Sequence, residues 1–502
     1  MNFPTKMFSL RSSSSGIGRF VFRIILVLFL FADVLAPEQI VLSASNDPQS
    51  QASKAADAES RNHTEQGLAG YAKVLCSAVF VSGRDLQEAK RNSGYFFLPE
   101  ADQRAPIDMV IDQKQKLVRL TLRGAITKTA KYFGDQGCVI LQPDSDRIFF
   151  KPVAVKSKLP DPMTQPWPMG DLQPEKSLPP EIDQSRLNKA VDLAFADADA
   201  LTAAFVVLYK GQIIAERYGP GIDKDTQLES WSMGKSITAT LIGILIKDGH
   251  FKLDDRAPVA EWQKPDDPRS AITIADLLRM SGGLRFSGQR DPGGLPDHFY
   301  IYTGAIDAFK FSYTRPQEFP PNTKGRYLNC DPLTLGYIVK ETVRKRGEEY
   351  LTFPQRALFD QIGIRRMVLE TDPYGNFLLT GYDYGTARNW ARLGLLYLWD
   401  GVWQGKRILP EGFAKFVSTP APAWDRPTYG GLFWLNRTGE WNLPEDAYFM
   451  AGAGGQRTFV VPSLDMVIVR LGHFRGDRRG MRALNESFKE LTSAIKSADK
   501  KN

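Results

Sequence analysis

Ser232 and Lys235, three residues apart, are the first pair in the chain whose types and spacing suggest chemistry. They open a segment, 237–246, that is apolar on nearly every side, and Gly249 follows it as a residue typical of a helix end. The pattern predicts a buried helix whose first turn carries both side chains on one face. A poorly solvated lysine there has a lowered pKa and can take a proton from the neighbouring hydroxyl. The pair therefore has the chemistry of an S-x-x-K nucleophile.

The same tetrad also has a simpler interpretation. A serine that caps a helix and a lysine whose stem lies along its apolar side occur at ordinary helix starts. Two further matches, Ser493 with Lys496 and Ser497 with Lys500, lie in a polar tail where nothing would desolvate the lysine. The tetrad alone favours an ordinary helix start, so a nucleophile requires a second group near the serine.

A tyrosine can share proton transfer with such a lysine, and the pattern Y-x-N occurs twice. Tyr327 and Asn329 form the first match, which directly precedes an apolar helix pattern. Tyr374 and Asn376 form the second, in a loop where asparagine beside glycine is ordinary turn chemistry. We therefore expect the first match, joined to Ser232, to be the functional one.

The second half of the chain has strand patterns at both of its ends, with helical and loop segments between them. This order predicts one antiparallel sheet assembled from the two ends of a domain spanning 183–502. The predicted strands are 205–209, 213–217, 433–435, 448–451, 458–461 and 466–470, and the predicted terminal helices are 186–195 and 482–494.

A smaller β-rich domain is predicted before it, over residues 66–157. It starts with a helix-like stretch, 68–81, and continues with alternating segments at 108–112 and 116–122 that have the period of half-buried strands. Crowded prolines over 158–182 predict an extended, semi-rigid connection to the larger domain. The small domain shows no set of catalytic side chains, and its role stays open.

The N-terminus has the pattern of an export signal over residues 1–44. A basic leader precedes an apolar run at 20–35, and Ala44 ends a stretch suited to cleavage. The run is short and interrupted for a membrane span, although an uncleaved anchor stays open as an alternative. The polar residues 45–65 predict a disordered linker. We expect the protein to be exported, as a periplasmic or secreted protein.

Composition narrows the classes of partner. The 502 residues are 43% hydrophobic and 24% charged, which is ordinary for a soluble globular protein. The net charge of +7 is spread along the chain without a dense basic run beside aromatic residues, which argues against nucleic-acid binding. The four histidines are isolated from one another, so we expect no metal site and no cofactor. In an exported protein Cys76 and Cys138 can form a disulfide, leaving Cys330 as a buried thiol.

With Ser232, Lys235 and Tyr327 taken together, the chain resembles the serine β-lactamase and penicillin-binding-protein superfamily. Within it, the chain is most similar to the branch of class C-related esterases and 6-aminohexanoate-dimer hydrolases. The resemblance covers about 203–471 and implies an α+β fold: a β-lactamase-like domain with an antiparallel sheet flanked by helices, plus an all-helical region. Segments that support it by their order are 272–283, 387–398 and 401–412.

The resemblance implies a role for each of these side chains. Ser232 would attack a carbonyl carbon and form an acyl-enzyme. Lys235 and Tyr327 would share the work of activating the serine, protonating the leaving group and later activating water. Asn329 would hold the lysine or a substrate carbonyl by a hydrogen bond.

The third motif of the family departs from its usual Lys-Thr-Gly form. Met450, Ala451 and Gly452 stand in that slot, followed by Ala453 and Gly454. The glycines would let substrate lie close to backbone, and the N–H groups of Ser232 and Ala453 would form the oxyanion hole. Loss of the lysine and threonine removes the usual anchor for a substrate carboxylate, which favours a neutral ester or linear amide. A plain β-turn is the structural alternative for this glycine run.

Three functions follow in order of preference. The first is an exported hydrolase of a small ester or amide. The second is a β-lactamase or a penicillin-binding D-Ala peptidase, and the third is a non-enzymatic scaffold with the same fold. A Ser-His-Asp hydrolase is disfavoured, because no G-x-S-x-G sequence surrounds Ser232.

Overall fold

The computed structural model describes residues 63–98, 106–142, 145, 147–173, 178–287 and 296–495. Every described residue belongs to one compact unit, Asp57–Asn502. The predicted export signal therefore lies outside the described residues. Within the described part of the chain, no helix combines the length and the hydropathy of a membrane span.

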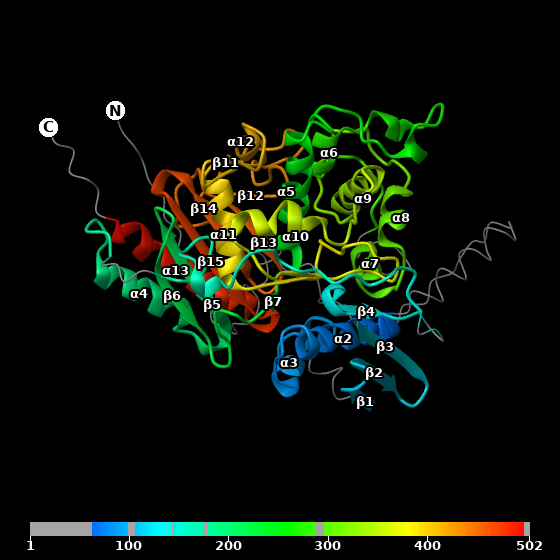
Figure 1. Ribbon diagram of the computed structural model, residues 1–502, viewed down its shortest axis with the longest axis horizontal. Coiled ribbons are helices and arrows are strands. Elements are labelled where there is room, and N and C mark those ends of the chain that lie inside the picture. Colours follow the sequence, from blue (N-terminus) through cyan, green and yellow to red (C-terminus); the bar gives the residue numbers. More distant parts are fainter. Residues whose placement is uncertain are drawn as a thin grey trace, which may run out of the picture. The chain divides into compact units, whose positions relative to one another are not determined.

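The main sheet has six antiparallel strands in the order β12-β13-β14-β15-β5-β6. Its two ends come from opposite ends of the larger domain, which confirms the predicted sheet (Figure 1). The fold class is therefore the predicted α+β arrangement. The strands are β5 (Thr202–Tyr209), β6 (Gln212–Tyr218), β12 (Trp434–Leu435), β13 (Tyr448–Gly452), β14 (Gln456–Val461) and β15 (Met466–Gly472).

Helices cover both faces of this sheet, because alternate side chains of its central strands point to opposite sides. α4 (Gln184–Phe195) and α13 (Asp477–Ala494) pack together and cover one face. α11 (Ala387–Leu398) covers the other face, where a Cβ on Gly394 would lie 2.5 Å from Val467. Side chains of the first face include Phe205, Val207, Phe459 and Ile468, and those of the second include Val206, Val460, Val467 and Val469.

The helical region is built around α5, which is buried from Gly234 to Leu245. This burial confirms the prediction from its apolar sequence, and Gly249 follows the helix in a left-handed conformation (φ 82°). α5 contacts α9 and α10, so neighbouring helices rather than solvent surround it. The described helices of this region are α5 (Gly234–Lys247), α6 (Ile274–Leu278), α7 (Asp297–Thr303), α8 (Ala308–Tyr313), α9 (Cys330–Lys345), α10 (Phe353–Ala357) and α12 (Phe413–Val417).

Short strands connect the two regions. β7 (Leu228–Glu229), β9 (Asp383–Gly385) and β8 (Val368–Leu369) form a three-stranded sheet in the order β7-β9-β8. β10 (Val402–Trp403) and β11 (Lys406–Arg407) form a separate hairpin. Because β7 ends at Glu229, this small sheet leads the chain directly into Ser232.

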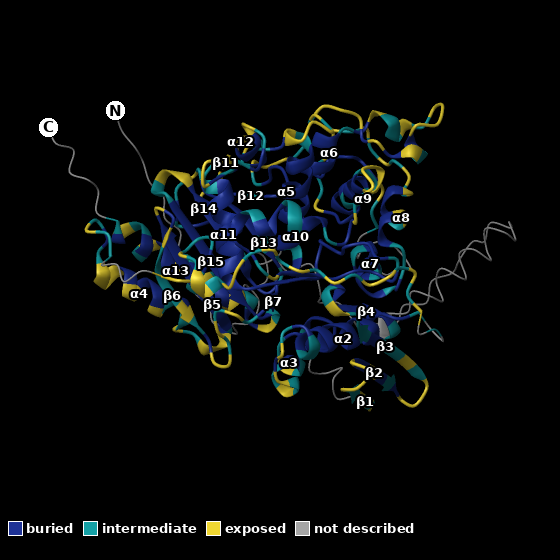
Figure 2. Cartoon of the chain, viewed as in Figure 1, coloured by how far each residue is buried: buried dark blue, intermediate teal, exposed yellow. Residues whose placement is uncertain are grey.

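The N-terminal part of the described chain forms its own four-stranded antiparallel sheet, in the order β1-β2-β3-β4. α2 packs on this sheet and also contacts α7 of the larger domain, so it is buried on both sides (Figure 2). α2 begins at His63, inside the end of the predicted linker. The elements are α2 (His63–Phe80), α3 (Leu86–Arg91), β1 (Ile107–Asp112), β2 (Leu117–Leu122), β3 (Ile126–Tyr132) and β4 (Cys138–Ile140).

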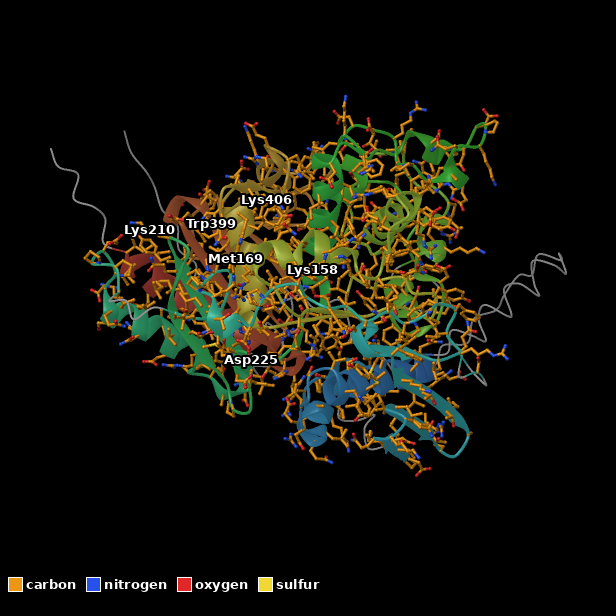
Figure 3. All side chains as sticks on the ribbon, in the orientation of Figure 1. Lys158, Met169, Lys210, Asp225, Trp399 and Lys406 are labelled. Carbon is orange, nitrogen blue, oxygen red and sulfur yellow. A yellow bond between two sulfur atoms is a disulfide. The ribbon has the colours of Figure 1, made fainter. Side chains whose placement is uncertain are left out.

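The proline-rich connection follows the surface of the larger domain. Arg392 of α11 donates to the carbonyls of Pro168 and Gly170, each at 2.7 Å. Trp403 donates from Nε1 to the sulfur of Met169 at 3.1 Å. Figure 3 labels Met169 and Lys158 of this connection. These contacts fix the connection at its centre.

A disulfide joins Cys76 of α2 to Cys138 of β4, with their Cα atoms 6.1 Å apart. The pairing that the sequence allowed is therefore present, and Cys330 is buried as a free thiol. The bond closes a loop across the N-terminal sheet and ties its helix to its last strand.

Removing this bond should destabilise the N-terminal part of the described chain. Because 62 residues separate the two cysteines, replacing both Cys76 and Cys138 by alanine should lower the free energy of unfolding by about 2–4 kcal/mol. Thermal unfolding with and without dithiothreitol measures this effect. Cys330→Ala is the control and should keep the response to the reductant. If dithiothreitol left the midpoint temperature of unfolding of the unmodified protein unchanged, the prediction would be contradicted.

Candidate active site

The backbone before Ser232 makes a tight turn between β7 and α5. Trp231 has a left-handed φ of 51°, and residues Trp231–Met233 form one 3₁₀ turn that runs into the helix. Ser230 holds the turn to β9: its N–H and its hydroxyl both donate to the carbonyl of Asp383, at 2.9 and 3.0 Å. Ser232 therefore lies just before the N-terminus of a buried helix, and the hydrogen bonds of Ser230 to β9 fix the backbone beside it.

Lys235 lies next to the serine. Its Nζ donates to Ser232 Oγ at 3.0 Å, and the lysine is only 1% exposed. Burial lowers its pKa to about 7, while the nearby Asp383 carboxyl acts in the opposite direction. A large fraction of this amine is therefore neutral at neutral pH and able to accept a proton.

The carbonyl of Thr380 is a common acceptor for the polar groups around the serine. It accepts from Ser232 Oγ at 3.3 Å and from Lys235 Nζ at 3.4 Å. The hydroxyl of Tyr302 donates to the same carbonyl. One backbone oxygen thereby holds three side chains from three elements at one point.

Tyr327 lies on the other side of the lysine. Lys235 Nζ is 4.7 Å from the centre of its ring, and the residue is 38% exposed. The rings of Trp434 and Tyr429 lie 5.4 and 6.0 Å from it. Desolvation raises the pKa of Tyr327, against a hydrogen-bond contact with Ser232, so this phenol holds its proton at neutral pH.

Asn329 contacts a tyrosine that the sequence did not reveal. Its Nδ2 donates to the hydroxyl of Tyr302 at 3.1 Å, where we expected a bond to the lysine or to substrate. Tyr302 lies on α7, and burial raises its pKa to about 12. Tyr302 lies in an aromatic and apolar segment that is typical of a buried core. The sequence therefore carries no signal that would mark this tyrosine as part of the site.

The glycine-rich segment lies against the nucleophile turn. A Cβ on Gly452 would lie 2.0 Å from the carbonyl oxygen of Ser230 and 3.1 Å from the amide nitrogen of Ser232. β13 ends there, and Gly454 and Gly455 follow in left-handed conformations (φ 82° and 73°). The segment is thus both a turn before β14 and the strand edge beside the serine, with Ala453 following Gly452 directly.

Two further ionisable groups lie near Lys235. Burial raises the pKa of Asp383 to about 8, and a Cβ on Gly234 would lie 2.3 Å from its Oδ1. Burial, assisted by the lysine, lowers the pKa of His298 to about 4, so this imidazole is neutral. Among the described residues, no group of three or more His, Cys, Asp or Glu side chains could hold a metal ion.

The second Y-x-N match has a structural role. Asn376 donates from Nδ2 to Asp307 and Asp372, both at 2.8 Å, and Gly375 is left-handed (φ 70°). This loop is the turn that its sequence predicted.

The reactivity of Ser232 should follow the protonation of Lys235. Below pH 7 the ammonium cannot accept a proton, so labelling by a fluorophosphonate probe should be slow and should rise to a plateau with an apparent pKa near 7. The pH dependence of the labelling rate measures this. In Lys235→Ala the labelling rate should fall by about 10²–10⁴-fold and should no longer rise with pH near pH 7. A flat profile between pH 5 and 9 would contradict the assignment.

Comparisons with known proteins agree with this architecture. Residues 187–486 match the family model described as Beta-lactamase. The 6-aminohexanoate-dimer hydrolase of Paenarthrobacter ureafaciens is 25% identical over 294 residues, covering 54% of this chain and 73% of that protein. Penicillin-binding protein 4 of Amycolatopsis lactamdurans is 26% identical over 257 residues, covering 44% and 63%. The solved structure of SurE with D-Leu superposes with a TM-score of 0.50 at 18% identity, covering 62% and 77%.

Proposed function

Because the chain belongs to the Beta-lactamase family, we propose that it is a serine hydrolase that cleaves an ester or a linear amide through an acyl-enzyme on Ser232. The observation that carries the proposal is the 3.0 Å contact between Ser232 Oγ and the buried Nζ of Lys235. A hydroxyl beside a partly neutral amine is the arrangement of an activated nucleophile.

Acylation begins when Lys235 takes the proton of Ser232 and Oγ attacks the carbonyl carbon. The negative charge that develops on the carbonyl oxygen is met by the N–H groups of Ser232 and Ala453, each donor contributing about 3 kcal/mol in related chemistry. Gly452 supports this placement, because only glycine lets the strand edge lie so close to the serine amide.

Tyr327 then supplies a proton to the leaving alcohol or amine as the tetrahedral intermediate collapses. The phenol is protonated at neutral pH, and Lys235, whose Nζ lies 4.7 Å from the centre of the ring, holds the proton that later restores it. Deacylation uses the same groups in reverse, with water in place of the leaving group. Tyr302 and Asn329 position the serine and lysine through the shared carbonyl of Thr380.

A neutral ester or amide is the favoured substrate. Met450 and Ala451 stand where the resemblance implies a lysine and a threonine that anchor a substrate carboxylate. The relative named 6-aminohexanoate-dimer hydrolase supports a linear amide as one member of this class. A β-lactamase or D-Ala peptidase is the second candidate, favoured by the relative named penicillin-binding protein 4. A scaffold without activity is the third.

Export is part of the proposal. The pattern of residues 1–44 supports it, and so does the Cys76–Cys138 disulfide, since such bonds persist in oxidising compartments. Retention of the segment as an N-terminal anchor is the alternative to its cleavage.

Parallel assays with a nitrophenyl ester, a linear amide and a chromogenic β-lactam should separate the candidates. The ester or amide should turn over, and Ser232→Ala should lower that turnover by about 10³-fold or more. Ser493→Ala, the serine of another S-x-x-K match, is the control and should behave as wild type. Equal turnover by Ser232→Ala and wild type would refute the proposal, and tight β-lactam labelling without ester turnover would favour the second candidate.

The two active-site tyrosines should differ in their effects. Tyr327→Phe removes the proposed proton donor and should slow acylation by about 10²–10⁴-fold. Tyr302→Phe removes two positioning hydrogen bonds, the one to the Thr380 carbonyl and the one from Asn329, and should cost about 10–100-fold, consistent with the net value of two such bonds. Stopped-flow burst kinetics measure both, with Tyr374→Phe from the second Y-x-N match as control. A larger loss in Tyr302→Phe than in Tyr327→Phe would reverse the assigned roles.

A further inference from the structure

The N-terminal domain reaches the turn that carries the nucleophile. The ring of Phe96 stacks on that of Trp231, with centroids 3.9 Å apart and planes 26° apart. Phe97 lies 5.7 Å from Phe299 of α7, the helix that carries Tyr302. The family model matches residues 187–486, so Phe96 lies outside the matched segment. It nevertheless contacts Trp231, the residue immediately before Ser232.

A buried ion pair reinforces this contact. Arg84 Nη1 lies 3.0 Å from Glu229 Oε2, and the two side chains are 3% and 6% exposed. Ser93 donates to the other carboxylate oxygen of Glu229. Because Glu229 ends β7, the N-terminal domain holds the backbone three residues before the serine as well as the aromatic ring beside it.

Lys73 of α2 makes a third contact on the same side. Its Nζ pairs with buried Glu370 and lies 4.4 Å from the centre of the Tyr382 ring. Tyr382 is in turn 5.9 Å from Trp231 and 5.4 Å from Tyr302. The aromatic cluster around the turn is thus enclosed by the N-terminal domain.

The turn needs such support because Trp231 adopts a conformation that bulky residues rarely take. Its φ of 51° lies in the left-handed region, where a side chain with a Cβ is crowded. A strained residue persists only when its surroundings over-determine it. Phe96 covers one face of the indole, and Trp231 is buried as a result.

The segment that contacts Trp231 is itself fixed. A Cβ on Gly94 would lie 2.3 Å from the ring of Tyr71, and one on Gly70 would lie 2.3 Å from the ring of Phe97. Both glycines let residues 94–98 lie directly on α2, which the disulfide at Cys76 ties to its sheet. Phe96 is therefore presented by a rigid support.

We propose that the N-terminal domain positions the nucleophile, with Phe96 and the Arg84–Glu229 pair holding the Trp231 turn so that Ser232 Oγ meets Lys235. Phe96, Arg84 and Trp231 are positioning residues. The consequence for catalysis rests on the proposed hydrolase function, whereas the hold on the turn does not.

Phe96→Ala tests the proposal in the full chain. Hydrogen exchange of backbone amides in peptides covering 228–236 should become at least about 10-fold faster, because the turn loses its cover. With a nitrophenyl ester, kcat should fall about 10–100-fold while KM changes less than about 3-fold, since a small misplacement of the nucleophile slows the chemical step. Phe96→Tyr, which keeps the ring, should restore both values to within about 3-fold of wild type.

Phe149→Ala is the control for loss of a stacked ring, because Phe149 stacks on Tyr374 at 4.6 Å and is 53% exposed, whereas Phe96 is buried against Trp231. It should leave exchange at 228–236 and kcat unchanged. Wild-type exchange in Phe96→Ala, or equal losses in Phe96→Ala and Phe149→Ala, would overturn the proposal. If wild type and Ser232→Ala turn over the ester equally, the hydrolase function fails, and the exchange rates alone then decide whether Phe96 holds the turn.

Discussion

The desolvation of one lysine is the constraint on which the rest of this site depends. A lysine in water is charged at neutral pH. Burial among α5 and its neighbouring helices lowers the pKa of Lys235 to about 7. A less buried amine would remain an ammonium and could not accept the proton of Ser232. In the proposed mechanism the apolar sequence of α5 serves the chemistry as well as the packing, and burying the amine costs free energy of folding.

Close backbone approach is the second requirement. Gly452 brings the end of β13 against the amide of Ser232, and Gly234 leaves room for the Asp383 carboxyl at the start of α5. The carbonyl of Thr380 then collects the hydroxyl of the serine, the amine of the lysine and the phenol of Tyr302. Backbone atoms therefore set where these reactive side chains lie.

Residues before the matched family segment also support the site. Their helix α2 is buried on both sides, and a disulfide joins that helix to β4. Phe96 stacks on Trp231, so this part of the chain adds a ring to the aromatic cluster beside the serine turn. A domain without catalytic side chains can thus take part in catalysis through rigidity alone.

Local patterns determined what the sequence could reveal by itself. The S-x-x-K spacing, the apolar run of α5 and the alternating strands at both ends of the larger domain are short-range features, and they predicted the buried helix and one antiparallel sheet built from both ends. Tyr302, the Thr380 carbonyl, the partner of Asn329 and the stacking of Phe96 on Trp231 were decided only by tertiary structure. Each joins residues from distant parts of the chain, and each side chain taken alone has the ordinary appearance of core. Periodicity reports which face of an element is buried, whereas the identity of the group across the interface depends on how the elements pack.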